Sequence, residues 1–203
     1  MKLIKLAAAA LISVSSLAAQ AGLISIEGGE YKAVPSNNDF QADLNPQTYN
    51  VGGNLVVAQN GSLNLEFSFL GKEADWLNTF TSLGNTITTT SGGSFSYSQN
   101  YSLGDLIEFS FKTGGVNVSP NVVANGDNND GEVKVSFAIA LDTEFNGVLY
   151  DAILFFDDTG GWNDDDNHDD LLIGIKASVP ESSTFVLMLM GLAGLFAARR
   201  LKA

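Results

Sequence analysis

Apolar and polar residues alternate with a period of two in three stretches of the chain, residues 63–69, 107–111 and 133–139. Successive side chains of a β-strand point to opposite faces, so this period predicts strands with one buried face and one solvated face. Such strands pair in antiparallel sheets. The alternation therefore predicts an all-β protein, and it limits the possible folds more than any other feature of the sequence.

The other apolar segments fit the same class. The run at residues 148–156 is nearly continuous, which predicts a central strand covered on both faces, although a buried helix gives the same pattern. Only residues 72–77 suggest a helix, of a single turn. Weaker strand signals occur at residues 23–26, 55–58, 95–97, 116–118 and 171–175.

Short glycine-containing dipeptides separate these segments. Asparagine or aspartate followed by glycine, or two consecutive glycines, readily adopt the positive φ angles of hairpin turns. Such dipeptides occur at residues 60–61, 92–93, 114–115, 130–131 and 146–147. About eight short strands with this spacing predict an antiparallel β-sandwich or jelly-roll-like domain.

The first 21 residues have the features of a secretory signal peptide. Two lysines precede the apolar residues 6–19, and Ala19 and Ala21 form a small-x-small cleavage site. We expect signal peptidase to cut after Ala21, so that the mature chain starts with the β domain at residues 22–178.

The last part of the chain, residues 179–203, combines a short polar motif, an apolar segment and a basic end. In order these are Val179, Pro180, Glu181 and Ser182, then the apolar residues 185–198, then Arg199 and Arg200. As a helix the apolar segment would be about 21 Å long, against a hydrocarbon core of about 30 Å. It has no polar face, so we expect a short, weakly held transmembrane helix, with its basic end as a cytoplasmic stop.

This three-part tail resembles the PEP-CTERM sorting signal of Gram-negative bacteria. In that family an exosortase, an integral membrane protease-transpeptidase, recognises and processes the signal. The third residue of the family's motif is usually proline, and Ser182 stands there instead. The resemblance implies an exported protein that is anchored transiently in the inner membrane and then reaches the cell surface or the extracellular space.

Charge and cysteine content exclude several partners and chemistries. The formal net charge is −13, so nucleic acid and anionic lipid are poor partners, whereas a divalent cation is a good one. The chain has no cysteine, which excludes thiol nucleophiles and cysteine-ligated zinc or iron–sulfur sites.

Candidate chemistry is concentrated at residues 157–170, an aspartate-rich segment between two predicted strands. Crowded carboxylates repel one another unless they are solvated, protonated or bridged by a cation. Calcium accepts six to eight oxygen ligands in flexible geometry. A solvated acidic loop without an ion is an almost equally good interpretation. The predicted calcium ligands are Asp157, Asp158, Asp164, Asp166, Asp169 and Asp170.

Two further resemblances concern this region. Residues 155–158 and 167–173 resemble a signature, F-E-D followed by D-[YFH]-[ND]-D-[LMF]-[VIL], near the C-terminus of many exported bacterial β domains. Asp157 stands in place of the usual glutamate, and Asn167 in place of the usual acidic residue. Residues 69–80 resemble a segment common in PEP-CTERM proteins. These resemblances imply a surface or matrix domain, with calcium as its expected ion.

Other sites are less well supported. His168 is the only histidine, and without cysteine or a second histidine it makes a poor zinc site. No G-x-S-x-G elbow accompanies it, which disfavours a nucleophilic hydrolase. The acidic residues 125–132 could supply ligands, but a plain hairpin loop is the better interpretation. Trp162 could stack on a sugar, although such a residue more often covers the end of a core.

Two functions remain. The first is a non-catalytic cell-surface or extracellular-matrix protein, sorted by an exosortase-like membrane protease and adhering to biofilm polysaccharide through calcium. The alternative is a secreted carbohydrate-active hydrolase that uses paired carboxylates, whose separation the sequence does not reveal.

Overall fold

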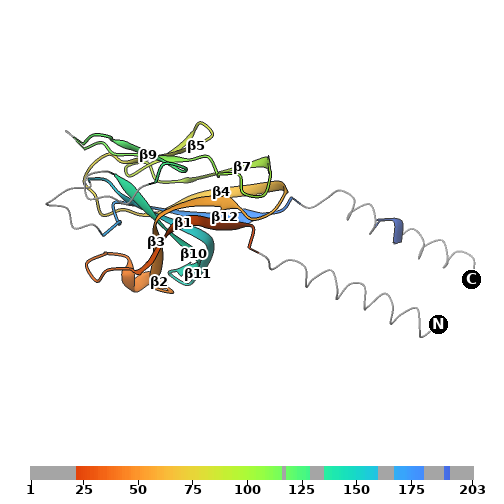
Figure 1. Cartoon of the computed structure of the whole chain (residues 1–203), viewed down its shortest axis with the longest axis horizontal. Coiled ribbons are helices and arrows are strands. Elements are labelled where there is room, and N and C mark those ends of the chain that lie inside the picture. Colours follow the sequence, from red (N-terminus) through yellow and green to blue (C-terminus); the bar gives the residue numbers. More distant parts are fainter. Residues whose placement is uncertain (1–21, 116–117, 129–134, 160–166, 181–189, 193–203) are drawn as a thin grey trace, which may run out of the picture.

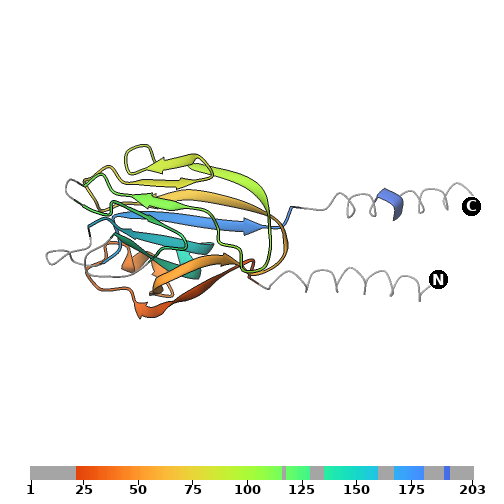
Figure 2. The same cartoon turned by 45° about the horizontal axis from the view of Figure 1, so that its top comes forward.

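The computed structural model describes residues 22–115, 118–128, 135–159, 167–180 and 190–192. Figures 1 and 2 show that strands make up nearly all of the regular secondary structure in this part of the chain, and these strands form two antiparallel sheets. The predicted all-β class is therefore confirmed. The predicted signal peptide with its cleavage site at Ala19 and Ala21 lies outside the described residues, and so does most of the tail beyond Pro180.

The larger sheet has eight strands. Seven of them follow the order β1-β3-β10-β11-β12-β4-β7, and β2 pairs separately with β10. The strands are β1 (Ile24–Ala33), β2 (Leu44–Asn45), β3 (Thr48–Val57), β4 (Gly61–Gly71), β7 (Ser94–Tyr101), β10 (Ser136–Phe145), β11 (Val148–Asp157) and β12 (Leu171–Ser178).

The smaller sheet has four strands in the order β6-β5-β8-β9. They are β5 (Thr79–Ser82), β6 (Asn85–Thr88), β8 (Ser110–Lys112) and β9 (Val122–Ala124). Every pairing in both sheets is antiparallel.

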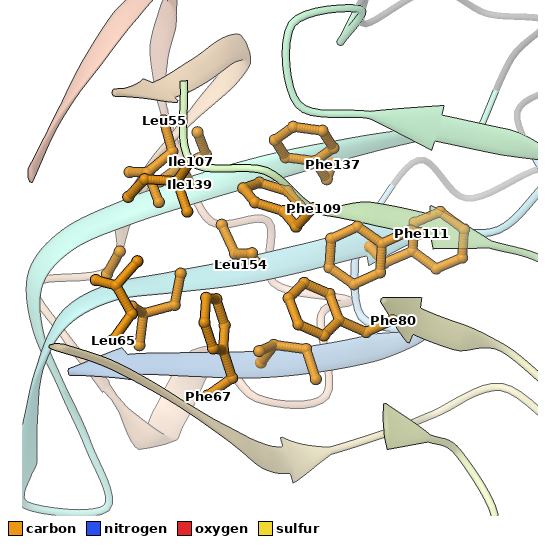
Figure 3. Packing of buried hydrophobic residues seen from close by; sticks show 14 of the residues in the cluster. Leu55, Leu65, Phe67, Phe80, Ile107, Phe109, Phe111, Phe137, Ile139 and Leu154 are labelled. Atoms are coloured by element: carbon orange, nitrogen blue, oxygen red, sulfur yellow. The ribbon is translucent and has the colours of Figure 1, made fainter. Parts of the chain in front are cut away.

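An aromatic core joins the two sheets. Phe111 of β8 stacks on Phe156 of β11 with ring centroids 4.8 Å apart, and Phe80 of β5 contacts Phe67 of β4 at 5.3 Å. Figure 3 shows Phe67, Phe80 and Phe111 pointing toward one another from different strands. Aromatic rings bury large apolar areas, so these contacts hold the smaller sheet against the larger one.

A second, smaller core lies on the opposite face of the larger sheet. Residues 34–47, which include the 3₁₀ turn η1 (Gln41–Asp43), contribute Val34 and Leu44 to it, beside Phe155 of β11. On β11, Leu154 and Phe156 belong to the first core and Ile153 and Phe155 to the second, all fully buried. The prediction of a central strand covered on both faces is confirmed, and the helix alternative is wrong.

Two predicted hairpin dipeptides adopt the expected backbone. Asn146 and Gly147 have φ angles of 51° and 76° in the two-residue loop between β10 and β11, where Phe145 faces Val148. In this hairpin, positive φ at both loop residues matches the right-handed twist of the flanking strands. Gly92 and Gly93 also have positive φ angles, 55° and 97°, but they connect β6 and β7, which lie in different sheets, so the hairpin predicted there is wrong.

Other details of the prediction were wrong. Residues 72–77 form no helix, because the backbone N–H of Glu73 donates across the fold to Asp169 instead of within a helical turn. Residues 106–109 keep the alternating burial of a strand, but only Ser110–Lys112 pairs as β8. The smaller sheet was largely missed because β5 and β6 are short and rich in threonine and asparagine.

In the described part of the chain no helix has the length and apolarity needed to span a bilayer. The predicted transmembrane helix at 185–198 falls outside the described residues, except for 190–192, which are helical. Arg199 and Arg200 of the predicted cytoplasmic stop also lie outside them.

Candidate metal centre

Two neighbouring strands bring the ends of the aspartate-rich segment together. β11 ends at Asp157 and β12 begins at Leu171, and the two strands pair side by side. The backbone N–H of Asp170 donates to the Phe156 carbonyl at 3.1 Å. The Asp158 N–H donates to Asp170 Oδ2 at 2.8 Å. Asp158 and Asp170 are therefore held next to each other at this end of the sheet.

A third element reaches the same place. β4 pairs with β12, with Gly71 opposite Leu172, so the chain that leaves β4 passes beside the start of β12. There the backbone N–H of Glu73 donates to the Asp169 carbonyl at 3.0 Å. This contact places the Glu73 side chain at the aspartate-rich segment, although the two are far apart in the sequence.

Three carboxylates converge as a result. Oxygen atoms of Glu73, Asp169 and Asp170 all lie within 4.8 Å of one another. Glu73 is exposed, Asp170 is half-buried, and only 1% of Asp169 is exposed. Ligand oxygens lie 2.3–2.6 Å from a calcium ion, so two oxygens of one site are separated by up to about 5 Å. The cluster has the spacing and the open side of a cation site.

The segment that covers the second core also supports this cluster. The backbone N–H of Asp39 donates to Asp169 Oδ2 at 2.8 Å. Asn38 Nδ2 donates to the Asn167 carbonyl at 2.7 Å, and Asn167 Nδ2 donates to the Asn37 carbonyl at 3.2 Å. These bonds fix the orientation of Asp169, as supporting groups commonly do around metal ligands.

Asp157 and Asp158 are buried beside the cluster, each 3% exposed. Asp158 Oδ2 accepts a hydrogen bond of 2.6 Å from Asn78 Nδ2, and Asp157 Oδ1 accepts one of 3.2 Å from the Thr159 N–H. A buried carboxylate is costly unless it is hydrogen-bonded or compensated by a cation. These flanks of the predicted loop are therefore buried and hydrogen-bonded, whereas its centre lies outside the described residues.

His168 is buried and packs against other side chains of the domain. It is 2% exposed, its Nε2 lies 3.0 Å from Ser136 Oγ, and its ring packs 5.7 Å from the ring of Tyr49. Ser136 is itself 1% exposed. Both side chains of this serine–histidine contact are therefore buried within the domain.

The structure places the six predicted calcium ligands in three different situations. Asp169 and Asp170 lie in the carboxylate cluster, whereas Asp157 and Asp158 lie outside that group of three. Asp164 and Asp166 fall outside the described residues, as does Trp162. Glu73 was not predicted, because only the pairing of β4 with β12 brings it to the site.

The second acidic loop acts as a structural element in its described part. Asn125 Nδ2 donates to the carbonyls of Leu55 and Ile107, each at 2.7 Å. Asn128 Nδ2 donates to the carbonyls of Gly53 at 2.7 Å and Phe137 at 2.8 Å. Both amides therefore tie neighbouring strands together.

Comparison with known proteins gives no further assignment: no family model matches the chain, and no curated protein or solved structure is significantly similar to it.

Proposed function

We propose that this chain is an exported, non-catalytic cell-surface or extracellular-matrix protein whose β domain binds calcium at Glu73, Asp169 and Asp170. The observation that carries the proposal is the convergence of these three carboxylates within 4.8 Å around a nearly fully buried aspartate. Three like charges at that distance repel strongly in a partly buried site, and a divalent cation between them would reverse the sign of the interaction.

Calcium fits the donors better than other metals do. The group contains only carboxylates, which are hard oxygen ligands, and the chain has no cysteine to favour zinc. Magnesium needs nearly octahedral geometry at 2.0–2.1 Å, whereas calcium accepts irregular sites with waters completing its shell. Glu73 is exposed, so it leaves such a site open on one side to water or to a sugar hydroxyl.

A structural role follows from the elements that the ion would join. Glu73 follows β4, Asp169 and Asp170 precede β12, and Asp39 belongs to the segment over the second core. An ion held there would link three parts of the fold, and an ion that binds only the folded state stabilises it. Asp169 is too deeply buried to flank a polysaccharide, so this cluster does not support the hydrolase alternative.

We also infer that the two sheets form a β-sandwich, as predicted. The inference is supported by the stacked pair Phe111 and Phe156 and by the contact of Phe67 with Phe80, since each pair joins one strand of each sheet.

Export and sorting are proposed from the two ends of the sequence: the signal peptide at 1–21, for signal peptidase, and the tail at 179–203, for an exosortase-like protease. In Figure 1 the start of β1 and the end of β12 lie at the same end of the domain. The carboxylate cluster lies at the start of β12, roughly 25 Å away along this strand of eight residues. The proposed metal centre would therefore face away from the membrane while the tail is inserted.

The test is thermal unfolding of residues 22–180 in calcium and in EDTA. Every buried apolar residue that the structure describes lies between Ile24 and Ile175, so this fragment contains the complete core. We expect calcium, but not magnesium at the same concentration, to raise the melting temperature, with no release of reducing ends from polysaccharides. An unchanged melting temperature would overturn the proposed calcium role, and glycan cleavage would favour the hydrolase.

A further inference from the structure

A long part of the chain carries no charge. Residues 76–104 contain no aspartate, glutamate, lysine, arginine or histidine, although the whole chain has a formal net charge of −13. Strands β5, β6 and β7 all lie within this segment. Like charges keep copies of an acidic protein apart, so a surface formed by this segment is where two copies can approach with the least repulsion.

β7 is at the edge of the larger sheet. It pairs with β4 along its whole length, from Ser94 opposite Ser68 to Tyr101 opposite Gly61, and no described strand pairs with its other side. An edge strand presents a row of backbone N–H and C=O groups that can pair with another chain. The side chains that face solvent along it are short and polar, namely Ser94, Ser96, Ser98 and Asn100.

The opposite edge of the same sheet is protected in two ways. β1 carries the exposed charged residues Glu27, Glu30 and Lys32. Its pairing with β3 is also interrupted at Gly29, whose backbone is distorted to a φ angle of 69°. Charged side chains and local distortions of the edge strand are among the features by which natural sheets prevent edge-to-edge association.

β7 has neither form of protection. Its sequence contains no charge, no proline and no glycine, and aromatic residues alternate with serine at Phe95 and Tyr97. The aromatic residues favour a strand, and the absence of charge, proline and glycine is shared with segments that pair with copies of themselves. The contrast with β1 distinguishes β7 from an ordinary edge strand.

The neighbouring part of the smaller sheet is also uncharged. Phe80 of β5 lies 6.3 Å from Phe95 of β7 between ring centroids, and Ser82 Oγ lies 2.9 Å from the Tyr97 hydroxyl. β6, the strand next to β5, is the edge of the smaller sheet and is uncharged too. An approaching copy would therefore meet no charge from β5, β6 or β7 themselves; Glu66 of β4, opposite Ser96, is the acidic residue one strand further in.

We propose that β7 pairs antiparallel with β7 of a second copy of this chain, joining two eight-stranded sheets across a two-fold axis. The exposed side chains of both copies lie on the same face of the joined sheet only if residues of the same face stand opposite each other. This condition holds when either Tyr97 or Ser98 lies on the axis, and the exposed serines then form one continuous polar surface. The partner is a second copy. Two acidic copies repel each other least along the uncharged β7, and a strand that pairs antiparallel with its own copy closes a two-fold dimer.

The first test is analytical ultracentrifugation of residues 22–180 in EDTA, which separates this association from calcium binding. We expect a monomer–dimer equilibrium. The double variant Ser96→Glu/Ser98→Glu should weaken it at least tenfold, because it adds like charges next to the axis. The control Ser36→Glu/Thr48→Glu adds the same two charges at exposed positions, one of them on β3 at the far side of the sheet from β7, and should dimerise as the unchanged protein does. A protein that stays monomeric up to millimolar concentration, or variants that dimerise equally, would overturn the proposal.

The second test uses the absence of cysteine. A single Ser98→Cys variant should form a disulfide-linked dimer under mild oxidation if Ser98 lies on the axis, because directly opposed residues are 4.5–5.5 Å apart between Cα atoms. If Tyr97 lies on the axis, residue 96 of one copy stands opposite residue 98 of the other. The Ser96→Cys variant mixed with the Ser98→Cys variant should then cross-link faster than either variant alone. The exposed control Ser178→Cys on β12 should cross-link much more slowly. Equal rates for all variants would contradict pairing through β7.

Discussion

The backbone N–H of Glu73 donates a hydrogen bond of 3.0 Å to the carbonyl oxygen of Asp169. This bond joins the chain that leaves β4 to the segment that enters β12, and it brings an exposed glutamate to a deeply buried aspartate. The candidate metal centre is a consequence of this long-range pairing, and the first two predictions concern its two members.

Replacing Asp169 should remove the response to calcium. Asp169→Asn can still accept the hydrogen bond from the Asp39 N–H but loses the charge that a cation needs. We expect no calcium-induced rise in melting temperature, with unchanged or slightly higher stability in EDTA because one repulsive charge is gone. The control Asp43→Asn removes an equal charge at an exposed position outside the carboxylate cluster and should keep the full rise. A full rise in Asp169→Asn would place the ion elsewhere.

Replacing Glu73 should weaken calcium binding without weakening the metal-free fold. The side chain is exposed, so Glu73→Gln leaves the packing intact, and its backbone bond to Asp169 does not depend on the side chain. We expect calcium affinity to fall roughly tenfold or more by isothermal titration calorimetry, a loss typical of one lost carboxylate ligand or a supporting group. Asp75→Asn, exposed on the same segment but outside the cluster, is the matched control. Equal affinities for both variants would show that Glu73 is not a ligand.

Sequence patterns predicted the central strand well and the site only in part. Residues 148–156 form a nearly continuous apolar run, so β11 was predicted nearly to its ends, although the run alone did not exclude a buried helix. Asp169 and Asp170 stood out through the crowding of aspartates. Glu73 had no such local signal, since its role depends on the pairing of β4 with β12.

The smaller sheet shows the same limit of prediction from sequence, here for a core residue. Phe80 is fully buried, yet it stands in a short strand of threonine and serine whose pattern is weak. It becomes a core residue only because β5 lies against Phe67 of the larger sheet. The sequence did not predict these features because they depend on contacts between strands that are far apart in the chain, and such contacts leave no local pattern.

The stacked pair between the sheets should contribute strongly to stability. Phe111 is fully buried and its ring lies nearly parallel to that of Phe156, with an interplanar angle of 7°. We expect Phe111→Ala to lower the free energy of unfolding by about 3–5 kcal/mol, measured by urea denaturation of residues 22–180. Leu103→Ala, at a side chain that is 65% exposed, should change it by less than about 0.5 kcal/mol. A small effect of Phe111→Ala would mean that the smaller sheet is only loosely attached.

Tyr101, at the end of β7, should make the fold sensitive to alkaline pH. Burial is the main cause that raises the pKa of its hydroxyl well above the ordinary value, and Tyr97, Glu108 and Asp105 add to it. The unfolded chain would lose this proton near pH 10 while the folded protein keeps it. The contribution to stability is therefore complete below about pH 10 and is lost as the pH rises toward the folded-state value.

Tyr101→Phe should remove that dependence, because phenylalanine has no proton to lose. We expect the free energy of unfolding to fall less steeply above pH 10 in this variant, by up to about 1.4 kcal/mol per pH unit, in urea titrations between pH 8 and 11. Tyr31→Phe removes a hydroxyl from a side chain that is 62% exposed and should leave the steep fall in place. Parallel pH profiles for Tyr101→Phe and the unchanged protein would show that Tyr101 ionises equally easily in both states, and that the end of β7 is open to water.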